Sequence, residues 1–258
     1  MILSYHNIAT TAGHYTVSLS NFEVQLNWLL QEGYQIVSLQ VYLDFLFQNG
    51  RNHPRQVVLT FDDAFQSFAD LVMPALQERQ LPAALFVPTG YLGKSNEWNA
   101  ASVRVPIMMA ETLSQIAGSP LLTIGSHTVS HPILARLNAA DLKWELESSK
   151  ERLESITGNP IDYLAYPFGQ PFIDVNARVQ QATAAAGYKA ALSTSFNRSN
   201  QVGDRYCLNR ITVESYHGLS GFQNAIKPLS FRSLKQQLKN GVSYLRQSFA
   251  LPAKQTGE

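Results

Sequence analysis

Residues 57–65 read VVLTFDDAF, an apolar run rich in β-branched residues that ends in two adjacent carboxylates, Asp62 and Asp63. β-Branched and aromatic residues favour strands, and a run without alternating polar residues is typical of a strand that is buried on both faces. Such strands occur in parallel sheets that are covered by helices. The stretch therefore predicts a parallel α/β sheet with acidic groups at the carboxyl end of one strand.

Apolar runs of the same kind recur along the chain and alternate with segments of helical periodicity. Strand-like runs cover residues 1–6, 34–39, 56–61, 82–89, 121–127, 162–169, 189–196 and 207–213. Helical patterns cover residues 20–33, 40–50, 62–80, 108–118, 138–158 and 176–187. This alternation is the pattern of a parallel α/β fold, and 258 residues suit a single barrel-like domain. We expect that domain to span residues 1–217, followed by a helical extension over residues 218–258.

The composition excludes several classes of protein. A formal net charge of +1 gives no overall field that would favour nucleic acid. Cys207 is the only cysteine, which leaves no disulfide framework and no cysteine-rich zinc site. The chain begins MILSYHNIAT, without a basic and apolar leader, and it contains no apolar run long enough to span a membrane. We therefore expect a cytoplasmic protein that does not bind nucleic acid.

Polar groups that suit metal chemistry follow two of the expected strands. Asp62 and Asp63 end one strand, and the segment SHTVSHP ends another with His127 and His131. The carboxyl ends of parallel strands meet at one rim of a sheet, so we expect these groups to converge. A spacing of four puts both imidazoles on one side of a helical turn. Two histidines and one carboxylate suit a divalent ion, which leaves the second carboxylate to handle protons.

Each motif also has a plainer explanation when it is taken alone. An aspartate after a strand is often the N-cap of the next helix. An isolated pair of histidines four residues apart is more often structural than metal-binding. The two motifs together, each directly after a β-branched strand and the second preceded by Gly125 and Ser126, favour a shared metal site.

The same residues carry a resemblance to a known family. LTFDDA (59–64), IGSHTVSHPIL (124–134) and LAYPFG (164–169) resemble the first three motifs of the polysaccharide deacetylases, the NodB-type domain of carbohydrate esterase family four. The similarity includes PAALFVPTGYLG (82–93) and covers roughly residues 1–215. The resemblance implies an irregular (β/α)7 barrel that hydrolyses N-acetyl groups of a carbohydrate with the help of a metal ion.

The resemblance also implies a role for individual residues. It makes Asp62 the general base and Asp63 a metal ligand, together with His127 and His131. A backbone N–H beside the proline of the third motif is implied to bind the oxyanion, in a segment that lines the substrate groove. That segment consists of Tyr166, Pro167, Phe168 and Gly169. We expect one divalent ion per chain, with zinc first and nickel or cobalt as alternatives.

Two positions of these motifs depart from the family pattern. The third motif usually has an arginine ahead of its proline, where this chain has Ala165 and Tyr166. We therefore expect Arg210 to belong to the site and to support the base. Ala64 stands where glycine is frequent, a change that costs nothing unless the backbone there needs a positive φ.

The expected general acid also departs from the common pattern. The family usually has a histidine on a late strand, but YCLNRITV (206–213) has none. SYHNI (4–8) resembles instead the circularly permuted branch that acts on poly-β-1,6-N-acetylglucosamine, in which an N-terminal histidine is the acid. This makes His6 the expected acid, with a buried structural histidine as the plainer alternative.

Two segments outside the motifs have open interpretations. Trp98 lies in a long loop over residues 90–106 and is expected either to stack on a sugar ring or to anchor the loop. The C-terminal extension has an apolar helical face and basic residues, so it either packs on the barrel or lies on an anionic membrane surface. That face consists of Leu234, Leu238, Val242, Leu245 and Phe249.

Together these observations predict a metal-dependent N-deacetylase whose partner is a polymer or oligomer that contains N-acetylglucosamine. Two alternatives stay open at the level of sequence. One is a related metal-dependent hydrolase of a cyclic or linear amide, and the other is a carbohydrate-binding relative without catalysis.

Overall fold

The apolar runs form a parallel sheet in the computed structural model, which describes residues 1–10, 15–98, 103–195, 199–214 and 218–226. The strands of the main sheet follow the order β10-β1-β5-β6-β7-β8-β9, and all neighbours are parallel. They are β1 (Ile2–Tyr5), β5 (Gln56–Phe61), β6 (Ala83–Val87), β7 (Leu122–Ser126), β8 (Tyr163–Ala165), β9 (Ala190–Leu192) and β10 (Ile211–Thr212). Because all strands run in one direction, their carboxyl ends form one rim.

Two shorter pairings accompany this sheet. The strand β4 (Gln35–Ile36) pairs with the beginning of β5 and is shorter than the expected run over 34–39. The strands β2 (Asn7–Ala9) and β3 (Thr16–Ser18) form a separate parallel pair directly after β1.

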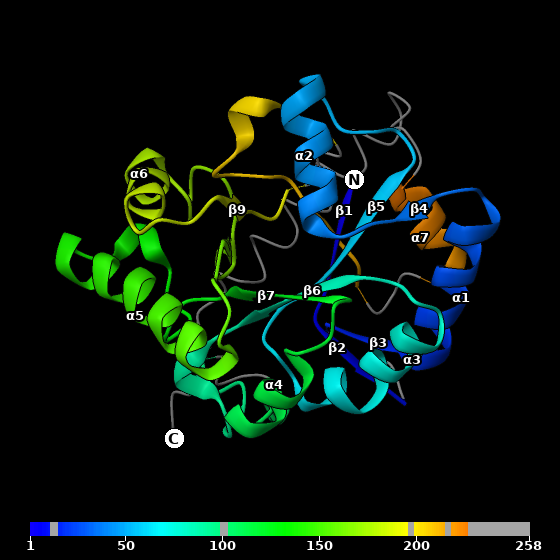
Figure 1. Cartoon of the computed structure of the whole chain (residues 1–258), viewed down its shortest axis with the longest axis horizontal. Coiled ribbons are helices and arrows are strands. Elements are labelled where there is room, and N and C mark those ends of the chain that lie inside the picture. Colours follow the sequence, from blue (N-terminus) through cyan, green and yellow to red (C-terminus); the bar gives the residue numbers. More distant parts are fainter. Residues whose placement is uncertain (11–14, 99–102, 196–198, 215–217, 227–258) are drawn as a thin grey trace, which may run out of the picture. The chain divides into compact units, whose positions relative to one another are not determined.

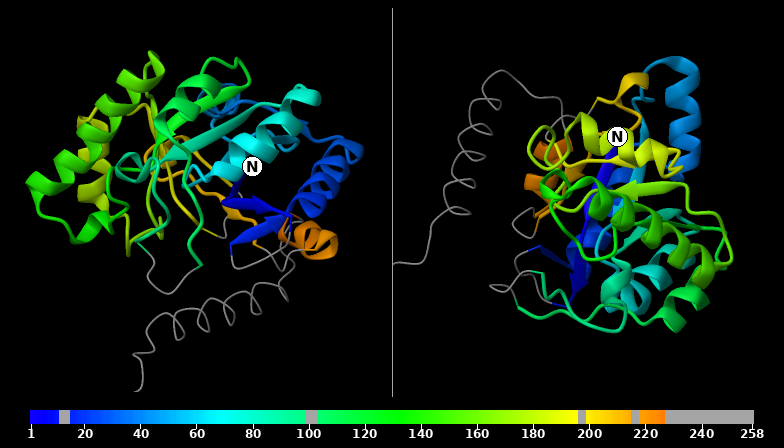
Figure 2. Two further views of the ribbon diagram at one scale, coloured as in Figure 1. Left: turned by 90° about the horizontal axis from the view of Figure 1, so that it is seen from below. Right: turned by 90° about the vertical axis from the view of Figure 1, so that its left-hand side faces the viewer.

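The helices lie around the sheet, as Figures 1 and 2 show from three directions. They are α1 (Leu19–Gln31), α2 (Leu39–Asn49), α3 (Met73–Glu78), α4 (Ala110–Ile116), α5 (Ala139–Thr157), α6 (Ala177–Ala185) and α7 (Leu219–Ile226). Capping residues set the bounds of α5, as expected from the pattern over 138–158. The side chain of Asn138 accepts the N–H of Asp141 at its beginning, and Gly158 ends it in the left-handed conformation with φ of 69°.

The segment after β5 differs from the continuous helix that the pattern over 62–80 predicts. The backbone first makes a sharp turn through two left-handed residues and then forms a π-helical turn over Phe68–Val72 before α3 begins. The N–H of Met73 donates to the carbonyl of Phe68, and Pro74 follows with no N–H to donate. A regular α-helix therefore covers only Met73–Glu78 of this segment.

The segment from residue 205 to 213 connects the two edges of the sheet. Its first half bonds to β9, because the N–H of Ala191 donates to the carbonyl of Arg205 and the N–H of Ser193 donates to that of Leu208. Its second half contains β10, which pairs with β1. The regular strand is thus shorter than the expected run over 207–213, yet the segment completes an irregular α/β barrel.

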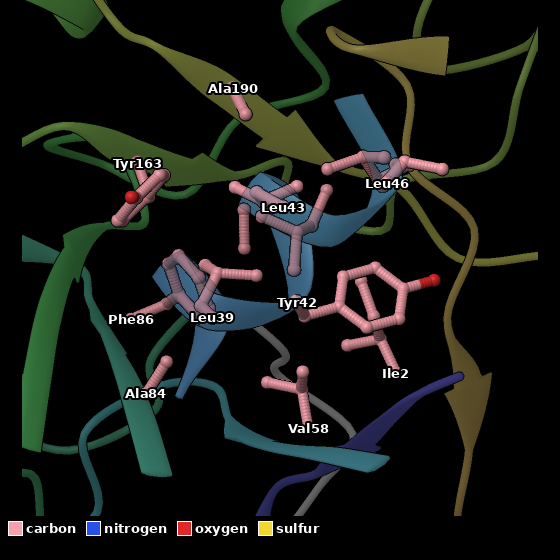
Figure 3. Close-up of a cluster of buried hydrophobic side chains, with 13 residues drawn as sticks. Ile2, Leu39, Tyr42, Leu43, Leu46, Val58, Ala84, Phe86, Tyr163 and Ala190 are labelled. Carbon is pink, nitrogen blue, oxygen red and sulfur yellow. The ribbon is translucent and has the colours of Figure 1, made fainter. Parts of the chain in front are cut away.

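The helix α2 packs on side chains of several strands in an apolar core (Figure 3). Leu39, Leu43 and Leu46 of this helix are buried against strand residues such as Val58 and Phe86. Full burial of each leucine contributes roughly 1.5–3 kcal/mol. The apolar core therefore lies between α2 and the strands, while the polar residues of the motifs follow the carboxyl ends of the strands.

The chain divides into two compact units, residues 1–222 and residues 223–258. The expected helical face of the C-terminal extension falls outside the described residues, and a domain boundary at residue 217 stays a prediction. Within the ranges that the structure describes, no helix combines the length and apolar character needed to cross a membrane.

Candidate metal and catalytic site

The candidate site lies at the carboxyl rim, where neighbouring strands bring together residues that are far apart in sequence. Asp62 and Asp63 follow β5, and His127 follows β7 two strands away. His6 follows β1, which pairs directly with β5 in a register that aligns Tyr5 with Phe61. The convergence that the sequence predicts for these groups therefore follows from the strand order.

The two aspartates diverge because the backbone turns between them. The N–H of Asp62 still bonds to the carbonyl of Tyr5 in the strand ladder, with an N···O distance of 2.9 Å. Asp63 and Ala64 then adopt left-handed conformations with φ of 70° and 51°. Ala64 thus occupies a position that does need a positive φ, which costs an alanine about 1–2 kcal/mol relative to ordinary helical backbone.

Asp62 is almost fully buried and is held by Arg210. The guanidinium donates two hydrogen bonds to the two carboxylate oxygens, at 2.7 and 2.8 Å, and Ser4 Oγ lies 3.4 Å from Asp62 Oδ2. Burial alone raises the pKa of Asp62, but the charge of Arg210 and its two bonds to the carboxylate outweigh it and hold the pKa well below its ordinary value. The carboxylate is therefore ionised and fixed in orientation.

Arg210 reaches the site only through Asp62. Its side chain has no exposed surface, and its remaining donors bond to the carbonyl of Ser193 at 3.0 Å and to Thr60 Oγ1 at 3.2 Å. Arg210 lies directly before β10, and its geometry fits the expected support of the base in place of the arginine that the third motif lacks. This geometry does not give Arg210 a surface for direct contact with substrate.

Asp63 forms a buried cluster with His127 and His131. The Oδ1 atom of Asp63 lies 3.5 Å from Nε2 of each histidine, and one ligand atom from each residue lies within 4.8 Å of the others. Oδ1 has no hydrogen-bond partner among the described residues. Two ligand atoms that are about 2.1 Å from a tetrahedrally coordinated ion lie roughly 3.4 Å apart, so this spacing fits a shared divalent cation.

The hydrogen bond of Nδ1 determines which ring nitrogen of His127 carries the proton. Nδ1 lies 2.7 Å from the carbonyl of Ala165, which can only accept, so Nδ1 carries the proton. Burial lowers the pKa of His127 to about 4, so the ring is neutral at pH 7. Nε2 consequently presents a lone pair toward Asp63. A carbonyl that orients a histidine in this way is a common second partner of metal ligands.

The two histidines meet by a different backbone path from the expected helical turn. Residues 128–131 are not helical, and Thr128 and His131 have φ of 70° and 56°. The expectation of a helical turn was therefore wrong, while the expected proximity of the rings is found at a centroid distance of 4.9 Å. The turn places both Nε2 atoms beside the same oxygen of Asp63.

His6 is half-buried beside the two carboxylates. Tyr5, directly before His6, is paired with Phe61, directly before Asp62, so the strand register places His6 near the two carboxylates. Its Nδ1 atom is buried without a hydrogen-bond partner among the described residues, and the ring packs 5.4 Å from that of Tyr15. His6 thus sits at the rim rather than in the apolar core, and its role as an acid stays a prediction.

The third motif separates into buried and exposed parts. Tyr166 is buried, with its hydroxyl bonded to Thr183 and to the carbonyl of Tyr206, and its N–H donates to Leu192. Phe168, by contrast, is 49% exposed. Its N–H has no acceptor among the described residues, so it is the available backbone donor beside the proline.

The remaining residues of this motif support the turn. Pro167 and Gly169 are buried, and Gly169 has φ of 69°. A Cβ atom on Gly169 would lie 3.0 Å from the backbone nitrogen of Thr194. Contact of Pro167 and Gly169 with substrate stays a prediction.

Trp98 lies against the histidine cluster. Its ring stacks on that of His131 at a centroid distance of 4.3 Å and an interplanar angle of 16°. Phe168 contacts the same imidazole with its edge, at 5.0 Å. The half-buried indole is thus an anchor for His131, and stacking on a sugar stays a prediction.

The sequence interpretation missed Glu145, a buried acidic residue of α5 that contacts the loop of His131. It belongs to the same helical face as the buried residues Leu142, Leu146 and Ser149. A carboxylate among apolar positions was the available signal, because such a group needs a specific partner when it is buried.

Comparisons with known proteins agree with the fold and the motifs. The family model described as polysaccharide deacetylase matches residues 49–191. A poly-β-1,6-N-acetyl-D-glucosamine N-deacetylase of Staphylococcus aureus is 23% identical over 222 residues, which span 83% of this chain and 72% of that protein.

Two solved structures have similar folds. The deacetylase PplD of Streptococcus pyogenes gives a TM-score of 0.72 at 24% identity, and the match covers 88% of this chain and 97% of the other. IcaB of Ammonifex degensii gives a TM-score of 0.72 at 23% identity, with coverage of 88% and 97%. At this level of identity the structures support the fold, an irregular barrel of the same kind.

Proposed function

The chain belongs to the polysaccharide deacetylase family, whose members are hydrolases, and we propose that it removes acetyl groups from a carbohydrate that contains N-acetylglucosamine. The observation that carries this proposal is the cluster of Asp63, His127 and His131, with its unpaired Oδ1 and its spacing of 3.5 Å. The cluster would hold one divalent ion. Two imidazoles and a carboxylate suit zinc, with nickel or cobalt as alternatives.

Asp62 is the base of the proposed reaction. It is ionised, it is held by two bonds from Arg210, and it is adjacent in sequence to the ligand Asp63. A carboxylate with a lowered pKa is a weak proton acceptor. The bound ion would offset this weakness, because a divalent cation makes water more acidic and polarises the acetamide carbonyl.

Two further groups would take part as the amide bond breaks. The free N–H of Phe168 would donate to the oxygen of the tetrahedral intermediate, where a single preorganised donor contributes on the order of 10²-fold or more. His6 would protonate the departing amine from the β1 side of the site. The exposed ring of Phe168 and the half-buried ring of Trp98 offer apolar surface to a sugar ring.

The proposed substrate is supported by the similarity to an enzyme named for poly-β-1,6-N-acetyl-D-glucosamine. Release of acetate from β-1,6-linked and β-1,4-linked N-acetylglucosamine oligomers tests it directly, with zinc present and with Asp62→Asn as the matched inactive control. We expect the wild type to release acetate from at least one of them and the variant to release about 10²-fold less. Hydrolysis of a cyclic amide without acetate release from either oligomer would instead support the alternative amide hydrolase.

A further inference from the structure

The loop over residues 128–131 carries the ligand His131 in an unusual conformation. Thr128 and His131 are both left-handed, although neither is glycine. Such conformations are unfavourable for residues with a Cβ atom and persist only where surrounding contacts over-determine them. The structure must therefore contain groups that hold this loop in place.

Glu145 of α5 is the main side-chain contact of the loop. Its Oε2 atom accepts the N–H of Val129 at 2.7 Å and the N–H of Ser130 at 2.9 Å, and its Oε1 atom accepts the hydroxyl of Ser130. Glu145 is 4% exposed. A buried carboxylate that accepts two backbone N–H groups forms charge-assisted bonds, which are roughly twice as strong as neutral ones.

The opposite side of the loop is fixed by the turn after β6. The N–H of Thr89 donates to the carbonyl of Thr128 at 3.0 Å, and the N–H of Gly90 donates to that of Val129 at 2.9 Å. The approach is close, since a Cβ atom on Gly90 would lie 2.7 Å from the Val129 oxygen. The loop is thus held between α5 and this turn.

The remaining N–H groups of the loop donate to side-chain hydroxyls of nearby residues. The N–H of Thr128 donates to Ser126 Oγ at 3.0 Å, and the N–H of His131 donates to Thr128 Oγ1 at 3.2 Å. Of the four loop N–H groups, the two that project from its middle depend on Glu145 alone. Removal of this acceptor would leave both unpaired.

We propose that Glu145 is a positioning residue for the metal site, which fixes His131 through the backbone of residues 129 and 130. The inference rests on the proposed metal-dependent function. Glu145 does not belong to the ligand cluster, so it acts on the metal only through the geometry of the loop. Partners that orient metal ligands typically contribute 10–100-fold to metal affinity.

The test is the zinc affinity of metal-free Glu145→Leu, Glu145→Gln and wild type, measured by competition with a chromophoric chelator. Leucine keeps much of the volume but accepts no hydrogen bond, so we expect zinc binding to weaken by about 10–100-fold. Glutamine keeps an oxygen for the two N–H groups, and its amide can donate to Ser130. We therefore expect Glu145→Gln to stay within about tenfold of the wild type.

Two controls separate positioning from loss of stability. Glu151→Gln removes an exposed acid of the same helix, and Leu153→Ala destabilises the helix without touching the loop. Both should bind zinc as the wild type does, at a temperature where circular dichroism reports folded protein. If Glu145→Leu does not fold, Glu145→Asp replaces it, because the shorter side chain withdraws the acceptor and should still weaken binding measurably.

The outcomes distinguish the two proposals. Zinc binding by the wild type and equally tight binding by folded Glu145→Leu, or by Glu145→Asp in its place, would overturn the role of Glu145 and leave the proposed function intact. A wild type that binds no zinc, nickel or cobalt would overturn the metal site and the role of Glu145 with it.

Discussion

Asp62 and Asp63 are neighbours in sequence, yet they differ in whether their carboxylate oxygens have hydrogen-bond partners. Both oxygens of Asp62 accept hydrogen bonds from Arg210, inside the barrel. Oδ1 of Asp63 is buried beside two imidazoles without a partner among the described residues. Buried polar groups are normally satisfied, so the unpaired oxygen of Asp63, unlike the paired oxygens of Asp62, is consistent with the proposed metal ligand.

Other buried polar atoms without a hydrogen-bond partner also lie mostly along the carboxyl rim. Buried unpaired atoms among the described residues include Nδ1 of His6, Nδ1 of His131 and Oγ1 of Thr89, all beyond the carboxyl ends of strands. The exception is Oε1 of Gln56, at the beginning of β5. Unpaired atoms therefore gather where a metal ion and a substrate would bind.

Removal of the metal should have the largest effect on turnover. It should affect the surroundings of Asp63 but not those of Asp62. Dialysis against a chelator is expected to lower turnover by about 10³-fold or more, because a divalent ion supplies several kcal/mol of charge stabilisation. Circular dichroism should report an unchanged fold, since the Asp62–Arg210 pair does not depend on the ion. Added zinc should restore activity, and full turnover in protein without metal would contradict the assignment of the cluster.

His6→Ala should show whether the imidazole of His6 takes part in the reaction. We expect turnover to fall by about 10²-fold, as for a lost general acid, with unchanged zinc stoichiometry. His53→Ala is the matched control, because His53 lies before β5, outside the cluster, and should leave turnover unchanged. A fully active His6→Ala enzyme would leave this histidine with a structural role.

Arg210→Gln should remove the two hydrogen bonds that the guanidinium donates to the buried carboxylate of Asp62. The pKa of Asp62 lies below its ordinary value of 3.8, so the pair stabilises the fold above that pH and loses this contribution as the pH falls toward the lowered value. Without the guanidinium, burial raises the pKa. The acidic limb of the pH–rate profile should therefore move to higher pH, and the folded state should lose about 3–5 kcal/mol.

Arg210→Lys provides the control for this variant, because it keeps the charge but not the two parallel bonds. Its acidic limb should lie between those of the wild type and Arg210→Gln. Identical profiles for all three proteins would show that Arg210 does not set the ionisation of Asp62.

Gly90→Ala should have the smallest effect and should act only through the loop that carries His131. The added methyl group would lie 2.7 Å from the Val129 carbonyl, so the loop of His131 must shift. We expect zinc affinity to fall by several-fold, up to about tenfold. Gly118→Ala meets open space and should not alter zinc affinity, so an equal loss in both variants would point to a general effect on stability.

The sequence predicted those parts of the fold that depend on local pattern. Residues 56–61 form β5 as expected, and α5 begins and ends at the capping residues Asn138 and Gly158. The segment over 62–80 was misjudged, because helical periodicity does not reveal two left-handed residues after Phe61. The strand over 207–213 was predicted too long, because only Ile211 and Thr212 pair regularly, while the first part of the run bonds irregularly to β9.

The candidate site was predicted where the chemistry lies in adjacent or closely spaced residues. Asp63, His127 and His131 converge as expected, because parallel strands bring their carboxyl ends together. The helical turn between the histidines was wrong, since a spacing of four does not fix the backbone conformation. Glu145 could not be assigned from the sequence, because its bonds to the loop exist only after α5 has packed on β7.

The most direct test of the division between the two aspartates is a zinc titration of Asp62→Asn and Asp63→Asn beside the wild type. We expect Asp62→Asn to bind one zinc ion per chain with nearly unchanged affinity and to lose most of its turnover. Asp63→Asn should bind zinc at least about 10-fold more weakly, because the amide replaces a charged ligand. Equal loss of zinc in both variants, or tight binding by Asp63→Asn, would contradict the account.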